Sequence, residues 1–144
     1  MNEEESPAMW KLYTSQNESI CVRSTYKRLA ALLPPESMFG CVRYIDYARD
    51  RFNTNEVLNY IVHKRKSFEH EREIRAVIYD NNINFERVDV KALIVPIDIG
   101  NLVEEIFVSP TSQASLSEVV TGLAEKYGLK APVRQSQVND PPAY

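Results

Sequence analysis

Long apolar runs and an excess of positive charge are both missing from this sequence. No stretch approaches the roughly 20 apolar residues that a membrane-spanning helix needs. Residues 1–6 (MNEEES) are acidic, where a secretory signal would be basic and then apolar. The net charge is -3, which gives no general attraction for nucleic acid or an anionic lipid surface. We therefore expect a cytoplasmic protein without membrane attachment and without bulk DNA binding.

Cysteine is scarce, and the common nucleotide and hydrolase motifs are absent. The only two cysteines, Cys21 and Cys41, lie in apolar stretches without a partner at a metal-ligand or redox spacing, so we predict buried, reduced thiols. No P-loop, dinucleotide fingerprint or nucleophile elbow occurs. His63 and His70 have no matching third ligand, which argues against a zinc site.

What remains is the size and balance of one compact domain, with 144 residues, of which 44% are hydrophobic and 26% charged. We predict a single α+β domain over residues 1–130, with a mixed, mostly antiparallel sheet of about five strands flanked by three or four helices. Residues 131–144 are expected to add an edge segment and then a flexible tail.

Periodicity, caps and turn residues predict the order of the elements. Helices are expected over 7–16, 25–33, 54–68, 99–104 and 115–127, and strands over 19–24, 38–46, 71–80, 86–98 and 105–109. The strands at 71–80 and 86–98 would pair as an antiparallel hairpin, because residues 80–82 (DNN) have turn chemistry.

The ends and inward faces of two helices can also be predicted. In the first helix, Met9, Leu12 and Tyr13 form one apolar stripe, and Trp10 lies off it. The last helix should start with a capping box and end at Gly128. The capping box comprises Ser115 and Glu118, and the inward residues comprise Leu116, Val119, Val120, Leu123 and Tyr127.

The densest charge lies at residues 63–75 (HKRKSFEHEREIR), which join a predicted helix to a predicted strand. Lys64 shares the helix face with apolar residues, while Glu71, Glu73 and Arg75 share a strand face, so the turn can gather the four into a partly buried cluster. One interpretation is a structural salt-bridge network or a solvated sheet face. The other is a catalytic site, because neighbouring charges can push the pKa values of carboxylates apart. Both stay open.

Two further groups are candidates for substrate binding. Arg23, Ser24 and Thr25 lie where a strand end meets a helix N-terminus, a geometry that suits a phosphate but that ordinary helix capping also explains. Trp10 and Tyr13 could stack on a base or nicotinamide ring, although aromatics at this spacing more often pack in a core or against a protein partner.

Five segments together resemble the prokaryotic domain of unknown function family numbered twenty-nine seventy-one. They are AMWKLY (8–13), CVRSTYKRL (21–29), VRYIDY (42–47), HKRKSFEHEREIRAV (63–77) and IFVSP (106–110). The family combines a Met-Trp-x-x-Tyr helix with a later Lys, aromatic, Glu-x-Glu-x-Arg segment. Its members are usually longer at the N-terminus, so the resemblance implies that this chain corresponds to their C-terminal half. It also implies a mobile-element or phage-defence setting.

The first of three functional hypotheses is a nucleotide-handling transferase similar in outline to ADP-ribosyltransferases, with NAD as the candidate cofactor. By that likeness Glu73 would hold the ribose, Glu71 would orient the acceptor, and Arg23 or Arg75 would bind a phosphate. The sequence departs from those enzymes, because the arginine or histidine strand expected upstream of Ser24 and Thr25 is absent.

The other two hypotheses belong to different classes of protein. A metal-dependent phosphoesterase would hold magnesium or manganese through Glu71 and Glu73 with Asp46 or Asp98. A non-enzymatic interaction module would bind a protein through Trp10, Tyr13 and the acidic N-terminus, and the charged residues would be structural. Among partners, a nucleotide ligand, a homo-oligomer and a missing N-terminal half all stay open.

Overall fold

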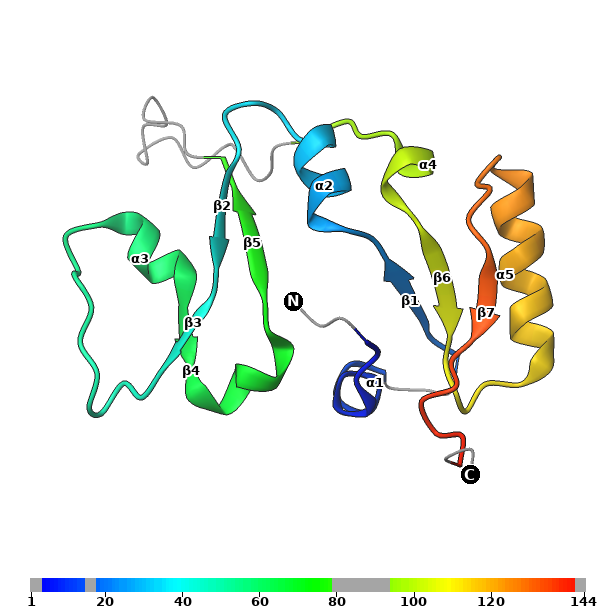
Figure 1. Ribbon diagram of the computed structural model, residues 1–144, viewed down its shortest axis with the longest axis horizontal. Helices are drawn as coiled ribbons and strands as arrows, with labels where there is room; N and C mark the ends of the chain where they lie inside the picture. The colour runs from blue at the N-terminus through cyan, green and yellow to red at the C-terminus, as the bar shows by residue number, and fades with distance from the viewer. Residues whose placement is uncertain (1–3, 15–17, 79–93, 142–144) are drawn as a thin grey trace. The chain divides into compact units, whose positions relative to one another are not determined.

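The structure, a computed structural model, describes residues 4–14, 18–78 and 94–141 and divides into two compact units (Figure 1). The central unit comprises Met1–Glu4 and Pro35–Ala92, and the terminal unit comprises Glu5–Pro34 and Leu93–Tyr144. No helix among the described residues is both long and apolar enough to cross a membrane. The single domain over 1–130 stays a prediction, since two compact units can still belong to one domain.

Both units contain helices and strands, which confirms the predicted α+β class. The elements of the terminal unit are α1 (Pro7–Tyr13), β1 (Ile20–Arg23), α2 (Tyr26–Leu32), α4 (Ile99–Leu102), β6 (Glu105–Val108), α5 (Ala114–Lys126) and β7 (Val133–Gln135). Those of the central unit are β2 (Met38–Cys41), β3 (Arg43–Ile45), α3 (Val57–Val62), β4 (His63–Arg65), the 3-10 helix η1 (Lys66–Glu71) and β5 (Ile74–Val77).

The predicted single sheet of about five strands is wrong. The described strands form three small sheets, in the orders β1-β6-β7, β2-β5 and β3-β4. Of the four strand pairs that the described residues form, two are antiparallel and two are parallel, so this pairing is not mostly antiparallel either.

The strand predicted over 38–46 splits into β2 and β3 at Val42. Its backbone N–H donates to the carbonyl oxygen of Glu73 at 2.9 Å, and the strands on either side of it then have different partners. β2 pairs antiparallel with β5, and β3 pairs parallel with β4. This exchange of partners divides the expected sheet in the central unit into two.

The helix predicted over 54–68 is only partly present. α3 ends at Val62, and the next three residues, which form β4, pair in parallel with β3. The chain then enters η1. Pairing with a strand about 20 residues earlier in the chain has overridden the local helical periodicity, as tertiary contacts commonly do.

The hairpin predicted from 71–80 and 86–98 is not formed by the described residues. Of the first arm, only β5 is a strand, and its partner is β2. The second arm lies mainly outside the described residues, and its described part, residues 94–98, contains no strand.

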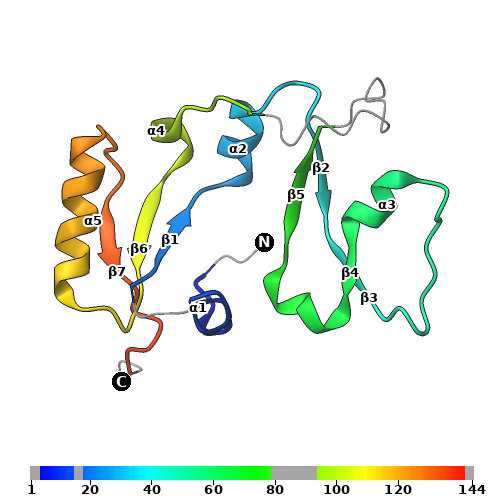
Figure 2. The ribbon, with the colours of Figure 1, turned by 180° about the vertical axis from the view of Figure 1, so that it is seen from behind.

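In the terminal unit, β6 lies between β1 and β7 and is the most buried strand. Val108 is 0% exposed, and Ile106 is buried beside it. β7 pairs in parallel at the sheet edge, as the sequence predicted for the segment from Ala131. Figures 1 and 2 both show α5 alongside β7, so the last helix packs beside this edge strand.

The helix α5 ends as predicted but begins and packs differently. Gly128 follows it with a φ of 72°, the left-handed backbone that commonly terminates a helix. The helix starts before Ser115, so the predicted capping box of Ser115 and Glu118 is wrong. Its buried residue is Ala124, while Tyr127 from the predicted inward stripe is 78% exposed. Leu116 and Val120 from that stripe are half-buried, whereas Val119 and Leu123 are exposed, so the apolar periodicity identified only part of the inward face.

The helix α1 starts at Pro7, as predicted, and the side chain of its N-cap, Ser6, accepts a hydrogen bond from the backbone N–H of Met9. Its predicted inward stripe is wrong. Trp10 is the buried residue of this helix, and its indole N–H donates to the Glu5 carboxylate at 2.9 Å. Leu12 and Tyr13 are 62% and 61% exposed.

The predicted burial of the two cysteines is wrong as well. Both cysteines are free and are exposed residues, Cys21 on β1 and Cys41 on β2. Among the described residues, each of these strands has one neighbouring strand, which leaves more of its surface to solvent.

Gly40 on β2 provides a test of how the central unit packs. A Cβ added there would lie 2.7 Å from Cγ1 of Val62, the last residue of α3. We expect Gly40→Ala to lower the free energy of unfolding by about 1–3 kcal/mol, the usual cost of overpacking, as measured by urea unfolding.

Gly122, inside α5, is the matched control, because an added Cβ there meets no atom within 4 Å. Gly122→Ala should stabilise the chain by about 0.5–1 kcal/mol through helix propensity. An unchanged unfolding midpoint for Gly40→Ala would contradict the close packing of α3 against β2.

Candidate functional site

Four side chains of the central unit form one connected group, which we call the charged cluster: Lys64, Glu71, Glu73 and Arg75. The ammonium of Lys64 contacts the Glu71 carboxylate and lies 3.3 Å from Oε2 of Glu73. Arg75 binds Glu73 at two points, Nε to Oε1 at 2.7 Å and Nη2 to Oε2 at 3.0 Å. The sequence predicted this grouping.

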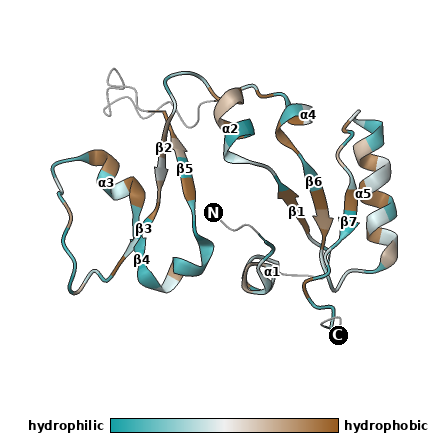
Figure 3. Ribbon diagram, viewed as in Figure 1, coloured by the Kyte–Doolittle hydropathy of each residue, from teal (hydrophilic) through white to brown (hydrophobic). Residues whose placement is uncertain are grey.

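The elements that carry the cluster differ from the helix and strand that the sequence predicted. Lys64 lies on β4 and Glu71 ends η1, the hydrophilic turn that joins β4 to β5 in Figure 3. Arg75 alone lies within a predicted strand that is present, β5. The tight turn of η1 returns the chain toward β4 and so brings Glu71 back to the lysine.

Backbone contacts fix the cluster in place. The Glu73 N–H donates to the Tyr44 hydroxyl at 2.8 Å, and the Glu73 carbonyl accepts the N–H of Val42 at 2.9 Å. The Arg75 guanidinium also donates to the carbonyl oxygen of Ile61 on α3. Hydrogen bonds therefore fix the backbone of Glu73 and the side chains of both Glu73 and Arg75.

Ion pairing shifts the pKa of three cluster members away from their ordinary values. The Arg75 guanidinium lowers the pKa of Glu73 below 4.5; desolvation opposes this effect and Lys64 adds to it. The Glu71 carboxylate raises the pKa of Lys64 above 10.5, and Glu73 raises that of Arg75. At neutral pH Glu73 is thus a fixed carboxylate, which can stabilise positive charge but has no proton to donate.

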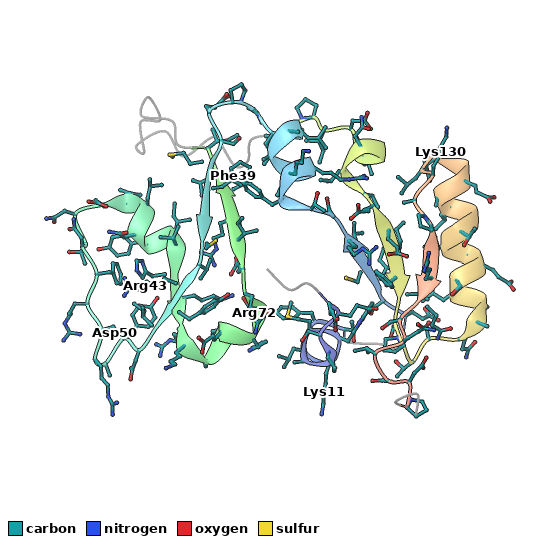
Figure 4. The ribbon with its side chains drawn as sticks, viewed as in Figure 1. Lys11, Phe39, Arg43, Asp50, Arg72 and Lys130 are labelled. Carbon is teal, nitrogen blue, oxygen red and sulfur yellow. The ribbon has the colours of Figure 1, made fainter. Side chains whose placement is uncertain are left out.

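A pocket of about 690 Å³ lies beside the charged cluster. We call it the Glu73 pocket, because Glu73 is the cluster member that lines it. The rest of its wall comprises Cys41, Val42, Tyr44, Glu69, His70 and Arg72. Figure 4 labels Arg72 at the turn where η1 ends.

The second predicted group lies in the terminal unit and has a structural role there. It comprises Arg23, Ser24 and Thr25. The Arg23 guanidinium lies 2.5 Å from the Glu105 carboxylate. The Ser24 hydroxyl donates to the carbonyl oxygen of Leu102 at 2.6 Å, and Thr25 is the N-cap of α2. These contacts favour the capping interpretation over a phosphate site.

Sequence reasoning missed the carboxylate of Glu105, whose side chain is only 4% exposed. It lies between Arg23 on β1 and Arg134 on β7, with Arg134 Nε 2.7 Å from Oε1. The available signal was an acid at the start of a strand that is otherwise apolar. Arg23 is therefore occupied by a buried partner, which a phosphate would have to displace.

The aromatic pair Trp10 and Tyr13 does not form a stacking surface. Trp10 is 9% exposed and its indole is bonded to Glu5, so it packs as a core residue. Tyr13 alone of the two is exposed.

The predicted metal ligands are not gathered into a site. No group of three or more His, Cys, Asp and Glu side chains in residues 4–14, 18–78 and 94–141 is placed to hold a metal ion. Asp46 accepts the N–H of Ala48 at 3.0 Å, and Asp98 caps α4. Glu71 and Glu73 face cations instead. This arrangement does not support a magnesium- or manganese-dependent phosphoesterase.

No protein-family model, curated protein or solved structure matches the chain. The resemblance to the family numbered twenty-nine seventy-one, and the defence setting that it implies, therefore stay predictions.

The pH dependence of the stability of Glu73→Gln tests the ion pairing of the charged cluster. Because the pKa of Glu73 is lower in the folded state than its ordinary value of 4.5, the ionised carboxylate stabilises the folded chain above that pH. This contribution is lost as the pH falls below 4.5 and through the folded-state pKa. We expect the urea midpoint of the wild type to fall more steeply in this range than that of Glu73→Gln.

The control is Glu36→Gln, which removes an exposed acid of the same unit and should follow the wild-type curve. If the wild type and Glu73→Gln lose stability in parallel, Glu73 does not have the ionised, paired state described above.

Proposed function

We propose that the chain handles a nucleotide, and that Glu73 is the charge-stabilising carboxylate of a transferase similar in outline to ADP-ribosyltransferases. The observation that supports this proposal is the state of Glu73: it lines a pocket, it is ionised, and Arg75 holds both of its oxygens. The candidate substrate is NAD.

The chemistry explains why such a carboxylate is useful. When the bond between ribose C1 and nicotinamide breaks, nicotinamide leaves with the bonding electrons and positive charge develops on the ribose ring. A carboxylate that is already ionised and oriented stabilises this charge without reorganising during the reaction. The incoming acceptor then forms the new bond to C1 and loses its proton to solvent.

The contacts of the other cluster members suggest supporting roles. The Glu71 side chain is only 6% exposed and contacts Lys64, so we propose that it positions the lysine rather than the acceptor. Arg75 is occupied by Glu73 and by the Ile61 carbonyl, so we propose that it orients Glu73 rather than a phosphate. The arginine of the second group, Arg23, has no part in the proposal.

Release of nicotinamide from NAD tests the proposed reaction. We expect Glu73→Gln to reduce the rate by about 10²-fold or more, since loss of one preorganised charge-stabilising group commonly has this effect. Chromatography of the products measures the rate, and Glu36→Gln should keep wild-type activity. If millimolar NAD neither yields nicotinamide nor raises the melting temperature of the wild type, the proposal is wrong.

A second function, the interaction module, is favoured by α1. The buried Trp10 holds this helix in place while Leu12 and Tyr13 are more than half exposed. Adjacent exposed leucine and tyrosine side chains are typical of protein contacts. In this case the charged cluster would be structural, which agrees with the mutual neutralisation of its cations and carboxylates.

A pull-down with the purified chain as bait separates the two functions. If the module is the function, replacing Leu12 and Tyr13 together by serine abolishes capture of a binding partner, while Glu73→Gln leaves it intact. Trp10 is unsuitable for this test, because its substitution would remove a core residue and cost about 3–5 kcal/mol. Equal capture by the wild type and the double variant would argue against the module.

A further inference from the structure

Arg72 has a backbone conformation that its residue type disfavours. Its φ and ψ are 46° and 49°, and among the described residues it is the only one besides glycine with a positive φ. It caps the end of η1, where its N–H donates to the carbonyl oxygen of Glu69 at 3.3 Å. Glycine or asparagine usually occupies such a position, because a larger side chain crowds the backbone. Strain of this kind points to a functional side chain.

The guanidinium of Arg72 is available to bind a ligand. Glu71 and Glu73, its two neighbours in the chain, both pair with Lys64, whereas Arg72 lines the Glu73 pocket. In the part of the chain that the structure describes, its side chain has no hydrogen bond or ion pair. Arg75, by contrast, has partners on both sides. Arg72 is thus a charged, forked donor that faces a pocket.

Two further groups of the pocket have unused hydrogen-bonding capacity. The Tyr44 hydroxyl accepts the N–H of Glu73, but its own proton has no acceptor among the described residues. Nε2 of His70 is buried and has no hydrogen-bond partner there. Buried polar groups are nearly always paired, so an unpaired one calls for an explanation.

The charges on the pocket wall limit where an anionic ligand can bind. Arg75 and Lys64 offset the charge of the Glu73 carboxylate, so it opposes an incoming anion less than a lone acid would. Glu69 also lines the pocket, and its carboxylate disfavours an anion that approaches it. An anionic group would therefore bind near Arg72 and away from Glu69.

We infer that the Glu73 pocket holds a phosphate group, bound by the guanidinium of Arg72 with the Tyr44 hydroxyl and the His70 imidazole as further donors. An arginine fork binds two oxygens of one phosphate, and donors from other residues suit the remaining oxygens of this tetrahedral group. Two sources of this phosphate are open to test. One is the diphosphate of a nucleotide, and this source rests on the proposed function. The other is free phosphate or pyrophosphate.

Calorimetric titration of the full chain with inorganic pyrophosphate tests the site. We expect Arg72→Gly to weaken binding by about tenfold or more, the effect of removing a hydrogen bond to a charged group. Its melting temperature should stay the same or rise, because glycine adopts the left-handed backbone without strain. Arg72→Asn, which also tolerates this backbone, should lose binding in the same way.

Two other variants control for the overall charge. Lys66→Gln removes one positive charge from the start of η1, outside the pocket wall, and should bind pyrophosphate like the wild type. Glu69→Gln removes the opposing carboxylate and should strengthen binding by a few-fold. If Arg72→Gly and Lys66→Gln bind equally, or if the wild type does not bind at millimolar pyrophosphate, the inference is overturned.

ADP-ribose and adenosine identify the source of the phosphate. Tighter binding of ADP-ribose than of pyrophosphate, lost in Arg72→Gly, supports a nucleotide, and equal binding of the two supports free phosphate or pyrophosphate. Binding of adenosine that equals that of ADP-ribose overturns the inference, because no phosphate would then be recognised.

The proposed reaction and the phosphate site can fail separately. Arg72-dependent binding of pyrophosphate without release of nicotinamide would leave the site standing and remove the reaction. Release of nicotinamide with an unchanged KM in Arg72→Gly would leave the reaction standing and remove the site.

Discussion

Glu73 connects the two small sheets of the central unit, because each of its polar groups binds a different part of the chain. Its N–H reaches Tyr44 on β3, and its carbonyl accepts from Val42 between β2 and β3. Its carboxylate meets Arg75 on β5 and Lys64 on β4. Isolated two-stranded sheets are marginally stable in water, so β2-β5 and β3-β4 depend on connections of this kind.

The apolar core of the central unit is small, so its polar contacts are more important. Among the described residues of this unit, Val42 and Ile45 are the only buried hydrophobic ones. An ion network adds little net stability when desolvation is counted, but removing one partner is costly. Its main contribution here is therefore to fix geometry. The positions of the cluster side chains are thus fixed mainly by paired charges.

The sequence predicted the structure where local signals decide it and failed where a remote strand decides it. Gly128 ends α5 as expected, and the charged cluster gathers as expected, because both depend on neighbouring residues. Residues 63–65 left their predicted helix for a strand about 20 residues away, and Glu105 is paired by an arginine that follows it by 29 positions. The left-handed backbone of Arg72 could not be foreseen, since no residue there favours it.

The position of β6 determines how the terminal unit can open. Backbone N–H groups in and just after β6 donate to both sides, from Ile106 to Pro132 and from Ser109 to Ser19, whereas β1 and β7 each have one neighbouring strand among the described residues. Loss of either edge strand would leave β6 paired with the other. Glu105 links the two edges through its two arginines. Amide hydrogens of β6 should therefore exchange with solvent more slowly than those of the edges, and this strand would be the last in the unit to lose its protection.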